Sequence, residues 1–552
     1  MRQAQRRSPR PRRGRRPVFV LVAAIIWGGA GFGLSLTVPA LASASHALVQ
    51  GSGSGWAANA VSQWVADVSQ NGLQVVYTSV GSAQGRKDFA YKTTDYAVSD
   101  IGYLGIDPAT GDQDTSLGRQ YVYLPIVAGG TAFPYQVRVG GTLVTNLRLS
   151  GLTIAKIFTN KITNWNDPSI TADNNGRKLP SIPIIPVVHS EGSGTSAQFT
   201  RYLSKLFPSM WRAYSGQSGL TEYYPRKGHQ IAQNGPDGVM NFVTSSAANG
   251  SIGYNEYSYA LGKNWPVAKV ENKSGYFTSP DQYNVAVALT QAKINLDKNP
   301  NHCQSLGYSP PCYLLQNLDS VYVYGDNRTY PLSSYSYMII PTASDDSRMT
   351  TAKRQTLADF IHYSICEGQA EMGPIGYSPL PINLVQASFS QVGALKAADP
   401  NVDISNTNAA NCHNPTFVPG QPKRNYLAQI APHPFPCDKV GQGPCTGNEG
   451  IVNGNPSSGK PTVIGSKGGK TTVAAVARGG KTKILLPLQQ PSGRPTGDGN
   501  ALIVAAPTTL AGRQSSNLGS LLTGLAVLEL LLLVGLPPFV FMRFRARAGK
   551  HA

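Results

Sequence analysis

Between residues 48 and 445 the chain repeats one local order: a short apolar strand, a glycine-rich loop, and then apolar residues at helical spacing. Residues 73–77 alternate as in a strand and lead into the loop TSVGSAQG. Residues 184–188 form the apolar run of a buried strand, the loop HSEGSGTS follows, and helical spacing continues through 199–206. Strands that alternate with helices predict an α/β fold with a largely parallel sheet. About 400 residues are too many for one sheet, so we expect two lobes.

The composition excludes several classes of protein. The hydrophobic fraction of 41% can bury a core, which excludes full disorder, and the charged fraction of 14% is too low for a coiled coil. The net charge of +19 is concentrated at the ends, because residues 48–445 contain 28 basic and 26 acidic side chains. A nearly neutral body argues against a basic groove, so no nucleic-acid partner is expected.

The N-terminal residues 1–47 have the pattern of a secretory signal peptide. Eight arginines within residues 1–16 precede an apolar run from about Val18 to Val38, and small residues follow it. We expect cleavage after Ala44 or Ala47. An uncleaved membrane anchor is the alternative, since the apolar run is long.

The C-terminal region has the pattern of a second membrane segment. Residues 518–542 contain one ionisable side chain, Glu529, and the basic tail 543–552 follows at once. This length spans a bilayer core, and the basic tail predicts that its side of the membrane is cytoplasmic. Residues 446–517 are rich in Gly, Pro, Ser, Thr and Lys, which predicts a flexible, disordered stalk. We therefore expect an exported, single-pass protein of the cell membrane with an extracellular N-terminal domain; a buried core helix at 518–542 is the alternative.

The cysteines indicate disulfides rather than a metal site. All six lie in the late part of the body: Cys303, Cys312, Cys366, Cys412, Cys437 and Cys445. An even number in an exported chain suggests disulfides, with 15 possible pairings. The pairs Cys303–Cys312 and Cys437–Cys445 would close natural short loops, which leaves Cys366–Cys412. The spacings match no zinc pattern.

Three loops rich in Gly, Ser and Thr lie at expected strand-to-helix junctions: GSGSGW (51–56), VGSAQG (80–85) and GSGTS (192–196). Glycine lets a backbone approach a ligand, and the free N–H groups of a helix start can bind an anion. Three such loops predict a tetrahedral oxyanion held by neutral donors. Helix caps and turns without a ligand are the alternative. None of the loops is a Walker loop or a nucleophile elbow.

Several segments resemble the PstS-like phosphate-binding proteins of ABC phosphate importers, in the periplasmic-binding-protein superfamily. The similarity extends from about 49 to 390, and its most specific segments are IFTNKITNWNDP and EGSGTS. It implies an α/β, two-lobed periplasmic-binding-protein-like fold with the ligand in the cleft. The first lobe would contain about 48–127 and 340–435, with crossovers near 127–133 and 335–341. It also implies an ABC permease and ATPase as partners, and no enzyme activity, cofactor or metal.

The resemblance carries a set of ligand contacts onto this chain: Gly55, Trp56, Ser82, Asp100, His189, Ser193, Gly194 and Thr195. Asp100 would accept a hydrogen bond from a protonated oxygen of the ligand. The chain departs from the family where Gly55-Trp56 replace the usual Thr-Phe. It departs again at His189, which replaces the usual Arg, while Glu191 occupies the place of that Arg's Asp partner. Arg86 and Lys87 are the nearby cations that could compensate.

These observations favour a membrane-tethered extracellular solute-binding protein that captures phosphate or a related oxyanion for ABC-type import. The alternative is a degenerate binding-protein scaffold used for surface adhesion or display without phosphate binding. A phosphatase-type enzyme has only Asp100 and His189 in its favour, and the sequence contains no metal-ligand cluster to support it.

Overall fold

The computed structural model describes residues 46–446, apart from 306, 409–411, 419–420 and 422–423. All of these residues belong to one compact unit. The expected signal peptide, except its last two residues, the stalk beyond Thr446, the membrane segment and the basic tail lie outside them. Among the described residues there is no helix with the length and apolarity needed to span a membrane.

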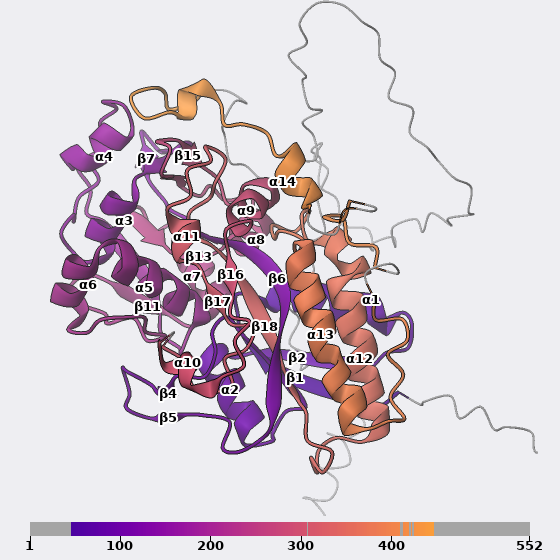
Figure 1. The fold of residues 1–552 in the computed structure, drawn as a ribbon. Coiled ribbons are helices and arrows are strands. Elements are labelled where there is room, and N and C mark those ends of the chain that lie inside the picture. Colours follow the sequence, from indigo (N-terminus) through magenta and orange to yellow (C-terminus); the bar gives the residue numbers. More distant parts are fainter. Residues whose placement is uncertain (1–45, 306, 409–411, 419–420, 422–423, 447–552) are drawn as a thin grey trace, which may run out of the picture. The chain divides into compact units, whose positions relative to one another are not determined.

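The largest sheet has six strands in the order β13-β6-β18-β3-β1-β2 (Figure 1). The strands are β1 (Val49–Gly53), β2 (Val75–Ser79), β3 (Tyr96–Ser99), β6 (Tyr121–Ala132), β13 (Asn255–Glu256) and β18 (Ser333–Pro341). We call residues 46–132, which end with β6, and residues 333–398, which begin with β18, the first lobe. The chain between these strands, residues 133–332, is the second lobe.

The expectation of a largely parallel sheet is wrong for half of the first lobe. The strand β1 pairs in parallel with β2 and β3, as predicted, but β18 is antiparallel to β3 and β6, and β13 is antiparallel to β6. The reason is the connection between the lobes. The chain leaves the first lobe along β6 and returns along its neighbour β18, and two adjacent strands that go out and come back must be antiparallel. The crossovers lie close to the predicted positions.

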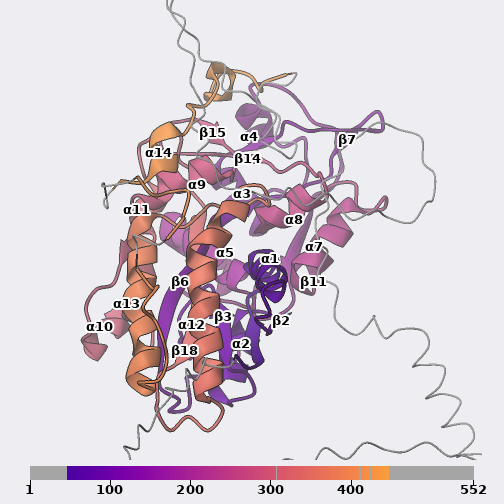
Figure 2. The ribbon, with the colours of Figure 1, turned by 90° about the vertical axis from the view of Figure 1, so that its right-hand side faces the viewer.

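Helices cover the first-lobe sheet. They are α1 (Ala58–Ser69), α2 (Ser82–Ala90), α12 (Thr351–Ile365) and α13 (Ile382–Ala398). The long helices α12 and α13 lie side by side, with α1 against α12 (Figure 2). Trp64 of α1 is fully buried, and its ring N–H donates to the carbonyl of Gly368 in the short 3-10 helix Glu367–Glu371. The helix α1 is therefore fixed to the chain that follows α12.

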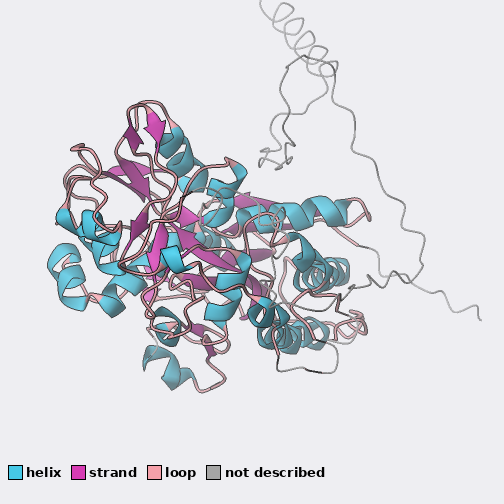
Figure 3. Ribbon diagram, turned by 90° about the horizontal axis from the view of Figure 1, so that it is seen from above, coloured by secondary structure: helices cyan, strands magenta, loops and turns pink. Residues whose placement is uncertain are grey.

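The second lobe is built on the parallel sheet β11-β10-β12, of β10 (Ile185–His189), β11 (Ile231–Gln233) and β12 (Ser251–Gly253). The helix α7 (Gly235–Thr244) packs against all three strands, and Figure 3 shows how helices and strands are distributed over the molecule as a whole. Four helices belong to this part of the chain as the structure describes it. They are α5 (Gly194–Leu206), α6 (Pro208–Ser215), α7 (Gly235–Thr244) and α8 (Tyr257–Gly262). A further sheet, β15-β14-β9, contains β9 (Arg148–Leu149), β14 (Lys269–Glu271) and β15 (Phe277–Thr278), with α3 (Gly151–Phe158) and α4 (Pro168–Asp173) nearby in the chain.

Shorter elements complete the described residues. Three two-stranded ribbons are β4 (Gly105–Ile106) with β5 (Gln113–Asp114), β7 (Arg138–Val139) with β8 (Thr142–Leu143), and β16 (Lys293–Ile294) with β17 (Gln316–Asn317). The remaining helices are α9 (Gln282–Leu289), α10 (Pro300–Ser305), α11 (Asp319–Tyr322), α14 (Tyr426–Ile430) and the 3-10 turn Pro436–Asp438. One continuous hydrophobic cluster includes residues of both lobes.

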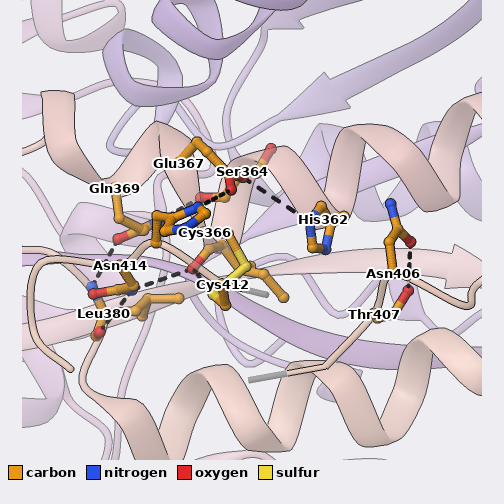
Figure 4. The surroundings of a disulfide bond; sticks show 12 residues. His362, Ser364, Cys366, Glu367, Gln369, Leu380, Asn406, Thr407, Cys412 and Asn414 are labelled. Atoms are coloured by element: carbon orange, nitrogen blue, oxygen red, sulfur yellow. Dashed lines mark hydrogen bonds and ion pairs between the residues drawn. A yellow bond between two sulfur atoms is a disulfide. The ribbon is translucent and has the colours of Figure 1, made fainter. Parts of the chain in front are cut away.

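The three disulfides are Cys303–Cys312, Cys366–Cys412 and Cys437–Cys445. They are the pairs that the short loops favoured. Figure 4 shows Cys366, at the end of α12, joined to Cys412. Next to this bond Asn414 donates to the carbonyls of Ile365 and Leu380, both at 3.2 Å. The late chain is therefore fixed to the first lobe at this point.

Residues 412–445, which we call the strap, end on the second lobe. The helix α14 packs on α9. Lys269 Nζ forms a buried ion pair with Asp438 Oδ2 at 2.6 Å, and Arg148 donates to the carbonyl of Cys437 at 2.9 Å. Asn146 donates to the carbonyl of Cys445 at 2.7 Å. The first lobe was expected to extend to 435, but the strap instead passes from one lobe to the other.

Candidate anion-binding site

The three glycine-rich loops lie where the sequence predicted them, between a strand and a helix. The first joins β1 to α1, the second joins β2 to α2, and the third joins β10 to α5. Because β1 and β2 are parallel neighbours, their loops emerge at the same edge of the first-lobe sheet. The third loop comes from the second lobe, and Ser193 caps α5 by accepting a hydrogen bond from the Ser196 N–H. Ala83 N donates to Gly192 O at 3.1 Å, so the second and third loops touch across the lobes.

Asp100 lies at the centre of these loops, immediately after β3, and is 2% exposed. Its carboxylate accepts hydrogen bonds from the hydroxyls of Ser54 (2.8 and 2.9 Å), Ser82 (3.2 Å) and Ser336. Burial raises the pKa of the Asp100 carboxyl above its ordinary value, although the three hydroxyls and the charge of Arg86 act in the opposite direction. We call Asp100, the three serines and Gly194 the Asp100 cluster.

The second lobe closes on this cluster at Gly194. A Cβ atom added to Gly194 would overlap Asp100 Oδ2 and Ser82 Oγ. Glycine is therefore required by the close approach of the backbone to these two side chains. The backbone at Gly194 therefore packs directly against the side chains of Asp100 and Ser82.

Several backbone donors around Asp100 have no acceptor among the residues that the structure describes. The N–H groups of five residues donate to no acceptor within the part of the chain that the structure describes: Gly55, Trp56, Ser82, Gly194 and Thr195. The hydroxyl of Thr195 is also buried and without a partner there. Orphaned N–H groups in a protein interior are rare, because each one costs free energy. All five belong to predicted site residues, and three of them lie at the starts of α2 and α5, where the helix dipole favours negative charge.

Unlike these backbone donors, the ring of His189 already has partners within the protein. Its Nδ1 is 2.6 Å from Glu191 Oε1, and its Nε2 is 3.2 Å from the carbonyl oxygen of Tyr254. Both ring nitrogens thus face acceptors within the protein. Burial pushes the pKa of Glu191 upward, but the attraction of His189 and the hydrogen bonds from His189 and the Gly235 N–H outweigh it and leave this pKa below its ordinary value.

The two nearby cations do not supply the missing charge in this structure. Arg86 is fully buried, and its guanidinium donates to Asp114, to Ser99 and to Glu222 of the second lobe. These bonds use all five of its N–H groups. Lys87 is exposed. We call Arg86, Ser99, Asp114 and Glu222 the Arg86 cluster.

Sequence reasoning missed several members of the two clusters, among them Ser54, Ser336 and Glu222. Ser54 lies inside the first predicted loop, so the loop itself was a signal for it. Ser336 lies on β18, 236 positions after Asp100, and no local pattern marks it. Glu222 follows α6 in an irregular segment and becomes visible only as the partner of Arg86.

Within the described residues, one group of side chains has the types and spacing that could suit a metal ion: His362, Cys366 and Glu367. The sulfur of Cys366 is bound in the disulfide with Cys412 (Figure 4). A thiolate is the form that binds metals, so this sulfur is not available as a ligand.

Comparisons with known proteins agree on one family. A family model described as a PBP superfamily domain matches residues 39–367. The chain is 30% identical over 322 residues to the phosphate-binding protein PstS of Pasteurella multocida, covering 58% of this chain and 83% of that protein. It is 31% identical over 349 residues to the phosphate-binding protein PstS 2 of Mycobacterium tuberculosis, covering 62% and 86%.

Solved structures were compared as well. A high-affinity periplasmic phosphate-binding protein solved with bound phosphate has 19% identity and a TM-score of 0.48, covering 64% of this chain and 99% of that one. A phosphate-binding protein from Stenotrophomonas maltophilia has 18% identity and a TM-score of 0.44, covering 64% and 99%.

Proposed function

The chain belongs to the PstS-like phosphate-binding proteins of the PBP superfamily, and from that premise we propose that it captures phosphate or a closely related oxyanion between its two lobes. The observation that carries the proposal is the set of five orphaned N–H groups around Asp100. A tetrahedral oxyanion would supply acceptors for them. Asp100 would accept a hydrogen bond from a protonated ligand oxygen, which phosphate has and sulfate lacks at neutral pH.

The proposed ligand contacts are the backbone donors of Gly55, Trp56, Ser82, Gly194 and Thr195, together with the hydroxyls of Ser82, Ser193 and Thr195. Ser54 lies one position before Gly55, but its hydroxyl already donates to Asp100, so it would replace the hydroxyl that Gly55 lacks only by leaving Asp100. His189, in this arrangement, faces the ligand only if it leaves Glu191 or Tyr254.

The proposal includes the cellular setting of the domain. The protein would be exported by residues 1–47 and held at the membrane by residues 518–542, with the binding domain outside. An ABC permease and ATPase would receive the ligand. The support for these partners is the family of the chain, and the support for the tether is the apolar run with its basic tail.

A second candidate is surface display on a scaffold that no longer binds phosphate. Two observations favour it: Gly194 lies directly against Asp100 and Ser82, and both nitrogens of His189 already face acceptors. Such a protein would keep its lobes closed and ignore the anion.

Calorimetry separates the two candidates. The full chain, purified in detergent, is titrated with phosphate, sulfate and methylphosphonate. The matched variants are Gly194→Ala, whose new methyl group would overlap Asp100 and Ser82, and Gly393→Ala, whose methyl group would meet no atom within 4 Å. Saturable phosphate binding that Gly194→Ala weakens at least about tenfold, and Gly393→Ala leaves unchanged, supports capture. No heat from millimolar phosphate supports display.

A further inference from the structure

The first glycine-rich loop is held from behind by three tyrosines. The hydroxyl of Tyr77 donates to the carbonyl of Ser54 at 2.8 Å, Tyr259 to that of Gly55 at 2.6 Å, and Tyr377 to that of Trp56 at 2.6 Å. Three consecutive carbonyls therefore each accept a hydrogen bond from a different side chain.

The tyrosines come from distant parts of the chain. One is on β2, one on α8 of the second-lobe segment, and one lies between the 3-10 helix Glu367–Glu371 and α13. Tyr259 is 6% exposed and Tyr377 is fully buried. Burial raises the pKa of both well above the ordinary value, so their hydroxyls keep their protons and donate. Three separate elements thus converge on one loop of three residues.

Each of these bonds fixes the direction of one N–H group. A trans peptide is planar, and its C=O and the following N–H point in opposite directions. Fixing the carbonyls of Ser54 and Gly55 therefore fixes the N–H groups of Gly55 and Trp56, two of the five orphaned donors. Fixing the carbonyl of Trp56 directs the N–H of Ala57, which donates to Ser54 Oγ at 3.1 Å.

The third bond thereby reaches the acceptor of the site. Ser54 Oγ accepts from Ala57 and donates to both oxygens of Asp100. The Tyr377 hydroxyl is thus connected to the Asp100 carboxylate through the peptide between Trp56 and Ala57 and the hydroxyl of Ser54. Glycine at position 55 is flexible in itself, so the loop needs such outside contacts to keep one conformation.

We infer that Tyr77, Tyr259 and Tyr377 are positioning residues, which set the anion-binding face of the 54–57 loop before the ligand arrives. The expected effect on phosphate binding rests on the proposed function. A preorganised loop does not lose conformational freedom when the anion binds, and the affinity is higher for that reason. None of the three hydroxyls is free to contact the ligand itself while it holds its carbonyl.

The test replaces each tyrosine by phenylalanine in the full chain, alone and together, with Tyr224→Phe as the matched control. Tyr224 is also buried, and its hydroxyl donates to the carbonyl of Phe158 at 2.6 Å, away from the loop. We expect each of the three variants to weaken phosphate binding about threefold to tenfold, and the triple variant at least about 30-fold. Tyr224→Phe should leave the Kd for phosphate within about twofold, although it loses a similar hydrogen bond.

A second readout does not depend on the ligand. Hydrogen exchange of a peptide that contains residues 54–57 is measured without phosphate. The triple variant should exchange there at least about tenfold faster than the wild type, while Tyr224→Phe should not. Equal loss of stability in all variants without this local change would mean a merely structural role.

The outcomes separate the two proposals. If the wild type binds phosphate and the three variants bind it equally well, the positioning inference is wrong and the proposed function stands. If the wild type does not bind phosphate, the proposed function fails, and unchanged exchange in the triple variant would then overturn the positioning inference too. Faster exchange confined to the loop would support positioning even in that case.

Discussion

The Asp100 cluster and the Arg86 cluster are neighbours on the same contact between the lobes, but they differ in what balances their charges. Arg86 donates to Ser99, the residue that precedes Asp100. In the Arg86 cluster one guanidinium lies between two carboxylates, Asp114 and Glu222. In the Asp100 cluster one carboxylate lies among three hydroxyls, with no cation bonded to it in the described residues.

The difference shows which residue carries the buried positive charge of this region. The family resemblance predicts an arginine at position 189, facing the ligand, but the chain has histidine there. The buried arginine of this region is Arg86, which joins the lobes directly through Glu222. An anion in the Asp100 cluster would therefore be held by neutral donors and by the starts of two helices. The Arg86–Glu222 ion pair beside it holds the two lobes together instead.

The largest effect is expected from removing the charge at the centre of the Arg86 cluster. Arg86→Met leaves Glu222 and Asp114 without their partner in a buried position, which costs about 3–5 kcal/mol of stability. Denaturant unfolding of the full chain measures it. Glu222→Gln is the control, because Arg86 keeps Asp114 there, and its effect should be clearly smaller. A change below about 1 kcal/mol in Arg86→Met would mean that this cluster contributes little to holding the lobes.

The next effect tests the acceptor in the Asp100 cluster. Asp100→Asn should weaken phosphate binding about tenfold to 100-fold, since a hydrogen bond to a charged group is lost. It should also allow some sulfate binding, because an amide can donate to an oxygen that has no proton. Titration of both anions at fixed pH measures this. The exposed Asp112→Asn serves as the control, and an unchanged phosphate affinity in Asp100→Asn would place the ligand elsewhere.

A third change gives the Asp100 side of the contact the cation that it lacks. His189→Arg should tighten phosphate binding about tenfold, because Glu191 already bonds the side chain at this position and would orient the new guanidinium. Calorimetry of the variant beside Lys87→Ala tests it. Lys87 is exposed, so its removal should change nothing. Phosphate binding that His189→Arg leaves unaltered would show that position 189 does not face the ligand.

The smallest effect concerns pH. The pKa of Glu191 lies below its ordinary value of 4.5 in the folded protein, so its carboxylate stabilises the fold above that value and loses this contribution as the pH falls through the lowered pKa. Glu191→Gln should therefore cost about 1 kcal/mol near pH 7, and the difference from the wild type should shrink below about pH 4.5. Unfolding across a pH series measures it; a difference that grows in acid would reverse the sign of this assignment.

The local part of this site could be predicted from the sequence, and the part made by distant contacts could not. Gly55, Ser82 and Gly194 lie in loops whose composition is visible in the chain, and strands β2 and β10 follow apolar patterns. Ser336, Glu222 and Tyr377 carry no such mark. Each becomes part of the site only because β18, the segment after α6 or the segment before α13 packs against the loops. The antiparallel half of the sheet was missed for the same reason, since periodicity does not report strand direction.

The strap has a mechanical consequence. The first described residues are fixed to the first lobe, because His46 bonds Asp359 and β1 is part of the first-lobe sheet. The last residues of the strap are fixed to the second lobe by the Lys269–Asp438 ion pair, next to the loop that the Cys437–Cys445 disulfide closes. The two ends are therefore carried by different lobes, and any parting of the lobes changes the distance between them. A force that pulls on both ends of the described chain would therefore be transmitted through the contact between the lobes.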